Sequence, residues 1–317
     1  MSLDHVPVLS NEILNYLNPK HVGIIVDTTV GLGGHSQNIL KHFDSINRLI
    51  GIDIDKSAIA IAKEKLYEYK DKIYLVHDNF ANLINILEKI GIYKVDSVLM
   101  DLGVSSLQLD TPYRGFSFQA SGDLDMRMDA GIGNSAADII NDFPPEELLS
   151  IFEEFGEERH SKRIVREIIS TRKQERITNT LQLASIVEKA YPNKKSPRSR
   201  SNNRRIHPAT RIFQALRIVV NKELDNLKEG LDAAVSLINP GGCLCIISFH
   251  SLEDRIVKRR FQTLSKNCIC PPKTPICICN HKKELNIITK RPVIPSVYEI
   301  ENNPRARSAK LRVATKV

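Results

Sequence analysis

The sequence lacks the features that would assign the chain to a membrane or to an export route. Its 317 residues contain no run of about eighteen apolar residues, so no membrane-spanning helix is expected. The first residues lack the basic and then apolar pattern of a signal peptide, and no repeat of the solenoid type occurs. These absences favour a cytoplasmic protein. A hydrophobic content of 42% suffices for one large domain or two modest ones.

Cysteine is scarce, and the six cysteines occur as three Cys-x-Cys pairs. Without an export signal we expect reduced thiols rather than disulfides. Cys243 and Cys245 lie in an apolar run and are expected in the core. The other four lie close together in the sequence: Cys268, Cys270, Cys277 and Cys279. They could form a tetrahedral metal site, but Cys-x-Cys is less usual than Cys-x-x-Cys for zinc. The sequence leaves this open, and we assign no metal ligand from it.

Acidic residues are absent between Glu188 and Glu223. The same stretch holds ten basic residues: Lys189, Lys194, Lys195, Arg198, Arg200, Arg204, Arg205, Arg211, Arg217 and Lys222. Charge of one sign over this length favours contact with phosphates over a merely solvated loop. The formal net charge of the whole chain, +8, also suits a polyanionic partner.

A glycine-rich turn is the most informative feature that the chain does contain. It holds Gly31, Gly33 and Gly34, after a short apolar strand at 22–26 and before a helix that starts near Gln37. Such a unit brings backbone N–H groups close to a ligand, which a Cβ would hold off. Close packing of the chain is the alternative reason for these glycines.

A second apolar strand ends in Asp53, nineteen residues after Gly34. An acid at this offset is placed to bind the hydroxyls of a ribose, so turn and acid together indicate a cofactor that contains adenosine. The dinucleotide fingerprint would have a third glycine where this chain has Ser36. No pair of residues for hydride transfer is apparent either. The sequence therefore favours S-adenosylmethionine over NAD.

Strands and helices alternate regularly, which indicates an α/β fold with a parallel sheet. Further strands are expected at 73–76, 96–101 and 243–248. The alternating run 309–314 is typical of an edge strand.

Ligands bind at the carboxyl ends of such strands, and three candidate residues follow those ends. Phe80 could hold an adenine, with core packing as the alternative. The position of Asp101 at the end of a buried strand favours a functional role, because an unpaired buried carboxylate would be costly. His250 also lies at a strand end, and a structural histidine is the alternative there.

The chain between the fourth and fifth strands follows a different pattern. Residues 107–129 have no clear period but are rich in aromatic and apolar residues, which indicates an ordered loop over a site. Residues 144–191 are helical throughout, and a long helix over 208–238 then returns the chain to the core. We therefore predict a discontinuous core, 1–110 and 207–317, and an insertion that comprises the loop and a helical domain, 111–206.

Several long runs resemble the bacterial small-subunit ribosomal RNA cytosine-N4 methyltransferases, a family also called MraW. The matching runs cover nearly the whole chain: 5–9, 27–36, 101–106, 114–118, 124–129, 156–159, 207–211, 248–255 and 303–308. The resemblance implies an α/β, Rossmann-like S-adenosylmethionine-dependent methyltransferase sheet with an inserted all-helical domain that recognises RNA. It also implies methylation of the exocyclic N4 of a cytidine in the decoding centre of 16S ribosomal RNA. We expect this RNA within the small ribosomal subunit as the partner, and free RNA as the substrate stays open.

The resemblance places cofactor contacts on seven residues: Gly33, Gly34, His35, Asp53, Phe80, Asp101 and Gln108. The position at strand ends places four residues near the reacting amino group: Asp101, Ser105, Ser106 and His250. One of three aromatic residues is expected to stack on the target base: Phe116, Phe118 or Phe249. Two rival functions stay open, an NAD-dependent dehydrogenase and an RNA-binding ribosome assembly factor with a vestigial methyltransferase fold. The oligomeric state is open as well, a homodimer included.

Overall fold

The computed structural model describes residues 7–17, 23–191, 207–271 and 276–317. It divides into two compact units. The sheet unit comprises 1–103 and 224–317, and the helical unit comprises 104–223. No helix in the described ranges is long and apolar enough to cross a membrane.

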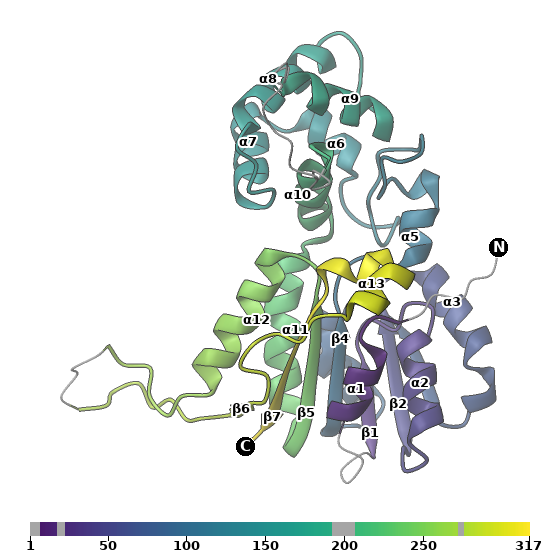
Figure 1. The fold of residues 1–317 in the computed structure, drawn as a ribbon, viewed down its shortest axis with the longest axis vertical. Coiled ribbons are helices and arrows are strands. Elements are labelled where there is room, and N and C mark those ends of the chain that lie inside the picture. Colours follow the sequence, from purple (N-terminus) through teal and green to yellow (C-terminus); the bar gives the residue numbers. More distant parts are fainter. Residues whose placement is uncertain (1–6, 18–22, 192–206, 272–275) are drawn as a thin grey trace. The chain divides into compact units, whose positions relative to one another are not determined.

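The sheet unit is built on seven strands in the order β3-β2-β1-β4-β5-β7-β6 (Figure 1). The strands are β1 (Ile24–Asp27), β2 (Arg48–Asp53), β3 (Ile73–His77), β4 (Val95–Asp101), β5 (Ile238–Ser248), β6 (Leu285–Ile287) and β7 (Lys310–Lys316). The first five pair in parallel, whereas β7 runs antiparallel to both β5 and β6. The predicted α/β class is thus confirmed, with a sheet that is mixed rather than wholly parallel.

The prediction of an edge strand at 309–314 is wrong. β7 lies between β5 and β6, and its residues from Leu311 to Ala314 are buried. The alternation of the sequence comes from Arg312, whose side chain is buried but donates to both carboxylate oxygens of Asp254 at 2.6 and 3.2 Å. A buried guanidinium paired in this bidentate way is compatible with an inner strand.

Seven helices of the described chain belong wholly or mainly to the sheet unit. They are α1 (Ser10–Tyr16), α2 (Gly34–His42), α3 (Lys56–Lys65), α4 (Leu83–Lys89), α11 (Glu223–Leu237), α12 (Ser251–Leu264) and α13 (Val297–Asn302). Neighbouring strand residues alternate between two apolar clusters, as Ile25 and Val26 do. One cluster includes α4, α11 and α12, and the other includes α1, α2 and α3. The two clusters therefore lie on opposite faces of the sheet.

The helical unit has a core of its own. Its helices are α5 (Ser106–Asp110), α6 (Ala136–Asp142), α7 (Pro145–Glu154), α8 (Ser161–Arg172), α9 (Thr180–Ala190) and α10 (Ala209–Asn221). Phe152, Ile164, Leu183 and Phe213 belong to one buried cluster contributed by α7, α8, α9 and α10.

The boundaries between the units differ from those that the sequence predicts. The structure divides the chain at 104 and 223 rather than at 111 and 206. The expected long helix at 208–238 is two helices, α10 and α11, interrupted at Lys222, whose φ of 51° is left-handed. The apolar side of α10 packs in the helical unit, so the chain returns to the sheet unit only after this break.

The loop at 107–129 is ordered, as expected. The Arg114 guanidinium donates to the carbonyl oxygens of Arg127 and Met128 at 3.2 and 2.9 Å. A Cβ added at Gly115, where φ is 77°, would overlap the backbone of Asp123. Glycine is therefore required where this loop folds back on itself.

Candidate active site

The glycine turn connects the end of β1 to the start of α2. Gly33 precedes the helix with a φ of 80°, in the left-handed region that favours glycine. A Cβ added at Gly33 would lie 3.0 Å from Leu66, and one added at Gly34 would lie 2.8 Å from Pro7. Packing within the sheet unit thus requires both glycines, whether or not a ligand at the turn requires them as well.

The Asp53 carboxylate lies against this turn. Its Oδ2 accepts the Gly31 N–H at 2.8 Å, and its Oδ1 accepts the Asp55 N–H at 2.8 Å. An ionised carboxylate offers about four acceptor positions, of which these bonds use two. Burial raises the pKa of Asp53 to about 6, although both N–H groups act in the opposite direction. The turn after β1 and the acid at the end of β2 are therefore joined directly.

Asp101 at the end of β4 is held at the same turn. Its N–H donates to Thr29 Oγ1 at 2.7 Å, and its Oδ2 lies 3.5 Å from His35 Nε2. Asp101 Oδ1 and His35 Nε2 are both buried, and neither has a hydrogen-bond partner in the described part of the chain. Because a buried carboxylate oxygen without a donor is costly, this pair indicates the place of a ligand that donates hydrogen bonds.

A third strand-end acid, Asp27, was missed by the sequence-based selection of site residues. Its Oδ2 accepts the Ser36 hydroxyl at 2.7 Å, and its Oδ1 accepts the Thr29 N–H at 3.3 Å. Burial raises the pKa of Asp27. Its position as the last residue of β1 is the signal that could have singled it out, since Asp53 and Asp101 end their strands in the same way. Asp27 fixes the first turn of α2 to β1.

His250 precedes α12 and caps it. Its Nδ1 accepts the Glu253 N–H at 3.5 Å, and its Nε2 lies 3.1 Å from Glu253 Oε1. Glu253 Oε2 in turn accepts the N–H groups of Phe249 and His250, at 2.8 and 3.2 Å. The structure thus shows the structural role that the sequence left as an alternative. A catalytic role of His250 stays a prediction.

A cavity of about 300 Å³ opens beside the carboxyl end of β5. Its lining includes Phe249, His250, Ile294, Ile300, Arg307 and Lys310. The other two aromatic candidates lie in the helical unit. Phe116 is buried, and Phe118 packs against the rings of His207 and Phe213 with centroids 4.7 and 4.9 Å away. Phe249 thus lines a cavity of the sheet unit, and stacking of any of the three rings on a base stays a prediction.

Phe80 shows the packing role that was its alternative. A Cβ added at Gly230 in α11 would overlap the Phe80 ring, so this side chain lies directly on that helix. Asn79 Oδ1 accepts the Ala81 N–H at 2.9 Å and caps the short turn that follows. A contact between Phe80 and an adenine stays a prediction.

The remaining site residues lie in the helical unit. Ser105 and Gln108 form a capping box at the start of α5, in which each side chain accepts the backbone N–H of the other residue. Ser106 Oγ is buried and has no hydrogen-bond partner within the described ranges. The capping box fixes both Ser105 and Gln108 locally, and their roles toward substrate and cofactor stay predictions.

Most of the basic stretch lies outside the residues that the structure describes. This holds for Lys194, Lys195, Arg198, Arg200, Arg204 and Arg205. Of those described, Arg217 donates to both oxygens of Glu223 at 2.8 and 3.1 Å, and Arg211 lies 3.6 Å from Glu158. These two arginines have carboxylate partners within the helical unit, and phosphate contact by the stretch stays a prediction.

Comparison with known proteins identifies the family. The model of the MraW methylase family matches residues 2–317. Ribosomal RNA small subunit methyltransferase H of Halothermothrix orenii is 50% identical over 315 residues, which cover 99% of each chain. The protein of the same name from Carboxydothermus hydrogenoformans is 48% identical over 100% of this chain and 99% of its own. That from Clostridioides difficile is 48% identical over 100% of both chains. The chain therefore belongs to the MraW methylase family.

Proposed function

We propose that this protein transfers a methyl group from S-adenosylmethionine to the exocyclic N4 of a cytidine in the decoding centre of 16S ribosomal RNA. Membership of a methylase family carries the reaction class and the methyl donor. Relatives named for the small ribosomal subunit support the RNA substrate. We further propose that the assembled subunit in the cytoplasm is the form of RNA that is methylated.

One observation carries the assignment of the site. Asp101 Oδ1 has no hydrogen-bond partner among the described residues. The Asp101 carboxylate lies near His35, at the turn that also holds the Asp53 carboxylate. We assign the two remaining acceptor positions of Asp53 to the ribose hydroxyls of the cofactor. We assign Asp101 to the place where the methyl donor and the amino group meet. Bound S-adenosylmethionine supplies a sulfonium methyl group that is already activated.

The task of the chain follows from the chemistry of the amino group. The N4 lone pair is delocalised into the cytosine ring, so N4 is a poor nucleophile. Bound S-adenosylmethionine would supply the methyl group, and N4 would carry positive charge until one amino proton passes to solvent. A fixed carboxylate oxygen in a buried site stabilises that charge by accepting a hydrogen bond from the amino group. We assign this role to Asp101 Oδ1.

The cavity at Phe249 offers a place for a base that has left its stack. An aromatic ring stacks on any base, and guanidinium and ammonium groups bind phosphates. Phe249, Arg307 and Lys310 line the same cavity within the sheet unit. We therefore propose that the target cytosine or its neighbouring nucleotide binds there.

The two rival functions lose support. A dehydrogenase disagrees with the family to which the chain belongs. An assembly factor with a vestigial fold would have no need of the strand-end acids. Here Asp53 and Asp101 are both present, and one oxygen of Asp101 accepts no hydrogen bond from the described residues.

Transfer to ribosomal RNA is the direct test of the proposal. Small subunits and free 16S RNA from cells without this protein are incubated with labelled S-adenosylmethionine and the purified chain. We expect label in the subunits and little in free RNA, and mass spectrometry of digested RNA should identify N4-methylcytidine. Label in another nucleotide would refute the specificity. The absence of label from both substrates would refute the proposed methyltransferase activity.

Cofactor binding should weaken in acid, because the pKa of Asp53 is raised to about 6. Two hydroxyls donate to the ionised carboxylate, whereas the protonated group has fewer acceptor positions. The dissociation constant should be nearly constant above about pH 7 and should rise by up to roughly tenfold per pH unit below the pKa. Calorimetric titration with S-adenosylmethionine between about pH 5 and about pH 8 measures this.

Asp53→Asn is the matched control for the pH dependence, and it should bind the cofactor weakly. Any dependence on pH that survives in this variant belongs to other groups, such as Asp27, whose pKa burial also raises. A constant affinity of the wild-type protein over the whole range would contradict the role assigned to Asp53.

A further inference from the structure

Between α12 and β6 the described chain forms two arms, 265–271 and 276–284, in which no residue is buried. The residues of both arms form neither a helix nor a strand. Their isoleucines point to solvent, with Ile269 48%, Ile276 76% and Ile278 79% exposed. Burial of apolar surface therefore cannot be what holds the two arms of this segment together.

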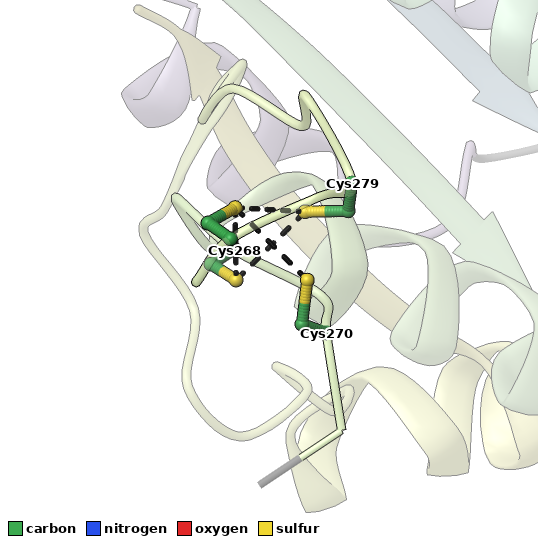
Figure 2. Close-up of side chains that lie close together, drawn as sticks. Cys268, Cys270 and Cys279 are labelled. Carbon is green, nitrogen blue, oxygen red and sulfur yellow. Dashed lines mark hydrogen bonds between the residues drawn. The ribbon is translucent and has the colours of Figure 1, made fainter. Parts of the chain in front are cut away.

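Four thiols converge at the point where the two arms meet. Figure 2 shows Cys268, Cys270 and Cys279 with their sulfur atoms turned toward a common centre. The Sγ of Cys277 lies 3.5 Å from those of Cys268 and Cys279 and 4.0 Å from that of Cys270. The Sγ atoms of Cys268 and Cys279 are 3.8 Å apart, and all four lie within 4.8 Å of one another.

These separations match the edges of a tetrahedron around one metal ion. Zinc–sulfur bonds of about 2.3 Å at tetrahedral angles place neighbouring sulfur atoms about 3.8 Å apart. A disulfide would require about 2.05 Å, and all four cysteines are free thiols. A cluster of several irons would distribute the four cysteines over different metal atoms and hold them farther apart than a single shared ion does.

We propose that Cys268, Cys270, Cys277 and Cys279 bind one Zn²⁺ ion. Four protein thiolates complete a tetrahedral shell, so no position remains for water or substrate, and the site is structural rather than catalytic. The Ile269 N–H donates to Cys279 Sγ at 3.5 Å, a bond to sulfur that stabilises a thiolate ligand. Binding releases the thiol protons to solvent and joins the two arms. The site does not depend on the methyltransferase function proposed above.

Metal analysis of the full-length chain tests the proposal. Protein purified without chelator should contain one zinc per chain, and the double variant Cys270→Ser/Cys277→Ser should contain less than about a tenth of that. The matched control is Cys243→Ala, which removes a thiol that is buried in the sheet unit and should leave the zinc content unchanged.

Replacement of zinc by cobalt in the wild-type protein tests the same site without the double variant, which could fold poorly. Wild-type protein stripped of metal and then given Co²⁺ should show thiolate-to-cobalt charge transfer and the visible bands of a tetrahedral ion. Treatment with chelator should make the 265–284 segment more sensitive to protease, and added zinc should reverse this. Less than a tenth of an equivalent of zinc with four titratable thiols would overturn the proposal. Stoichiometric iron in place of zinc would overturn it as well.

Discussion

Asp101→Asn should reduce the rate of methyl transfer at saturating S-adenosylmethionine by about 10²–10⁴-fold, the range for removal of a well-placed acid–base or charge-stabilising group. The substitution keeps the shape of the side chain. It replaces an oxygen by an NH₂ group, which cannot accept a hydrogen bond, and it removes the negative charge. The Asp101 N–H bond to Thr29 comes from the backbone and should persist.

The Asp101 experiment separates chemistry from binding. Single-turnover methylation of small subunits gives the rate, and calorimetry gives the cofactor affinity, which should fall less than the rate does. Asp71→Asn makes the same chemical change at an exposed position of the sheet unit and should leave both quantities unchanged. If Asp101→Asn kept near-normal turnover at saturating cofactor, the carboxylate would be structural and the proposed role wrong.

Asp53→Ala should weaken S-adenosylmethionine binding by about 1.5–3 kcal/mol, or roughly ten- to hundredfold, because hydrogen bonds to a charged group are lost. The fold should survive, since the variant removes a carboxylate whose ionisation burial opposes. It leaves the N–H groups of Gly31 and Asp55 without their acceptor, so a modest fall in melting temperature is expected.

Calorimetric titration measures the affinity of the Asp53→Ala variant, and thermal denaturation without ligand reports its stability. Asp71→Ala is the matched control and should match the wild type in both measurements. Unchanged affinity in Asp53→Ala would refute the ribose assignment. A fall in affinity together with a loss of cooperative unfolding would show a structural role instead.

The arrangement of the acids around the glycine turn could be predicted because it depends on local patterns. A strand of buried residues, a glycine turn and a helix recur in a parallel sheet in one arrangement, and the carboxyl ends of neighbouring strands meet at one edge. Asp53 and Asp101 could therefore be placed near the turn from their positions alone, and the structure joins both to it. Asp27 obeys the same rule and was missed because it belongs to the strand that leads into the turn.

What could not be predicted depends on partners that are distant in the sequence. Arg312 gives β7 the alternation of an edge strand, and only the carboxylate of Asp254 explains its burial. Phe80 packs on a glycine that lies far along the chain in α11. No glycine or proline marks the break between α10 and α11 at Lys222 in the sequence. The predicted boundary of the helical unit, 206, therefore differs from the observed one, 223.

The place of β7 in the sheet has a consequence for synthesis. The ribosome makes all six other strands before the one that joins β5 to β6. Until β7 emerges, β5 is an open edge with unpaired N–H and C=O groups and apolar side chains on both faces, which is a template for aggregation. A nascent chain that ends shortly before residue 310 would therefore lack only β7 and would expose an aggregation-prone edge strand. Products truncated by a stop codon shortly before residue 310 should therefore aggregate and be degraded. They should not persist as an enzyme of reduced activity.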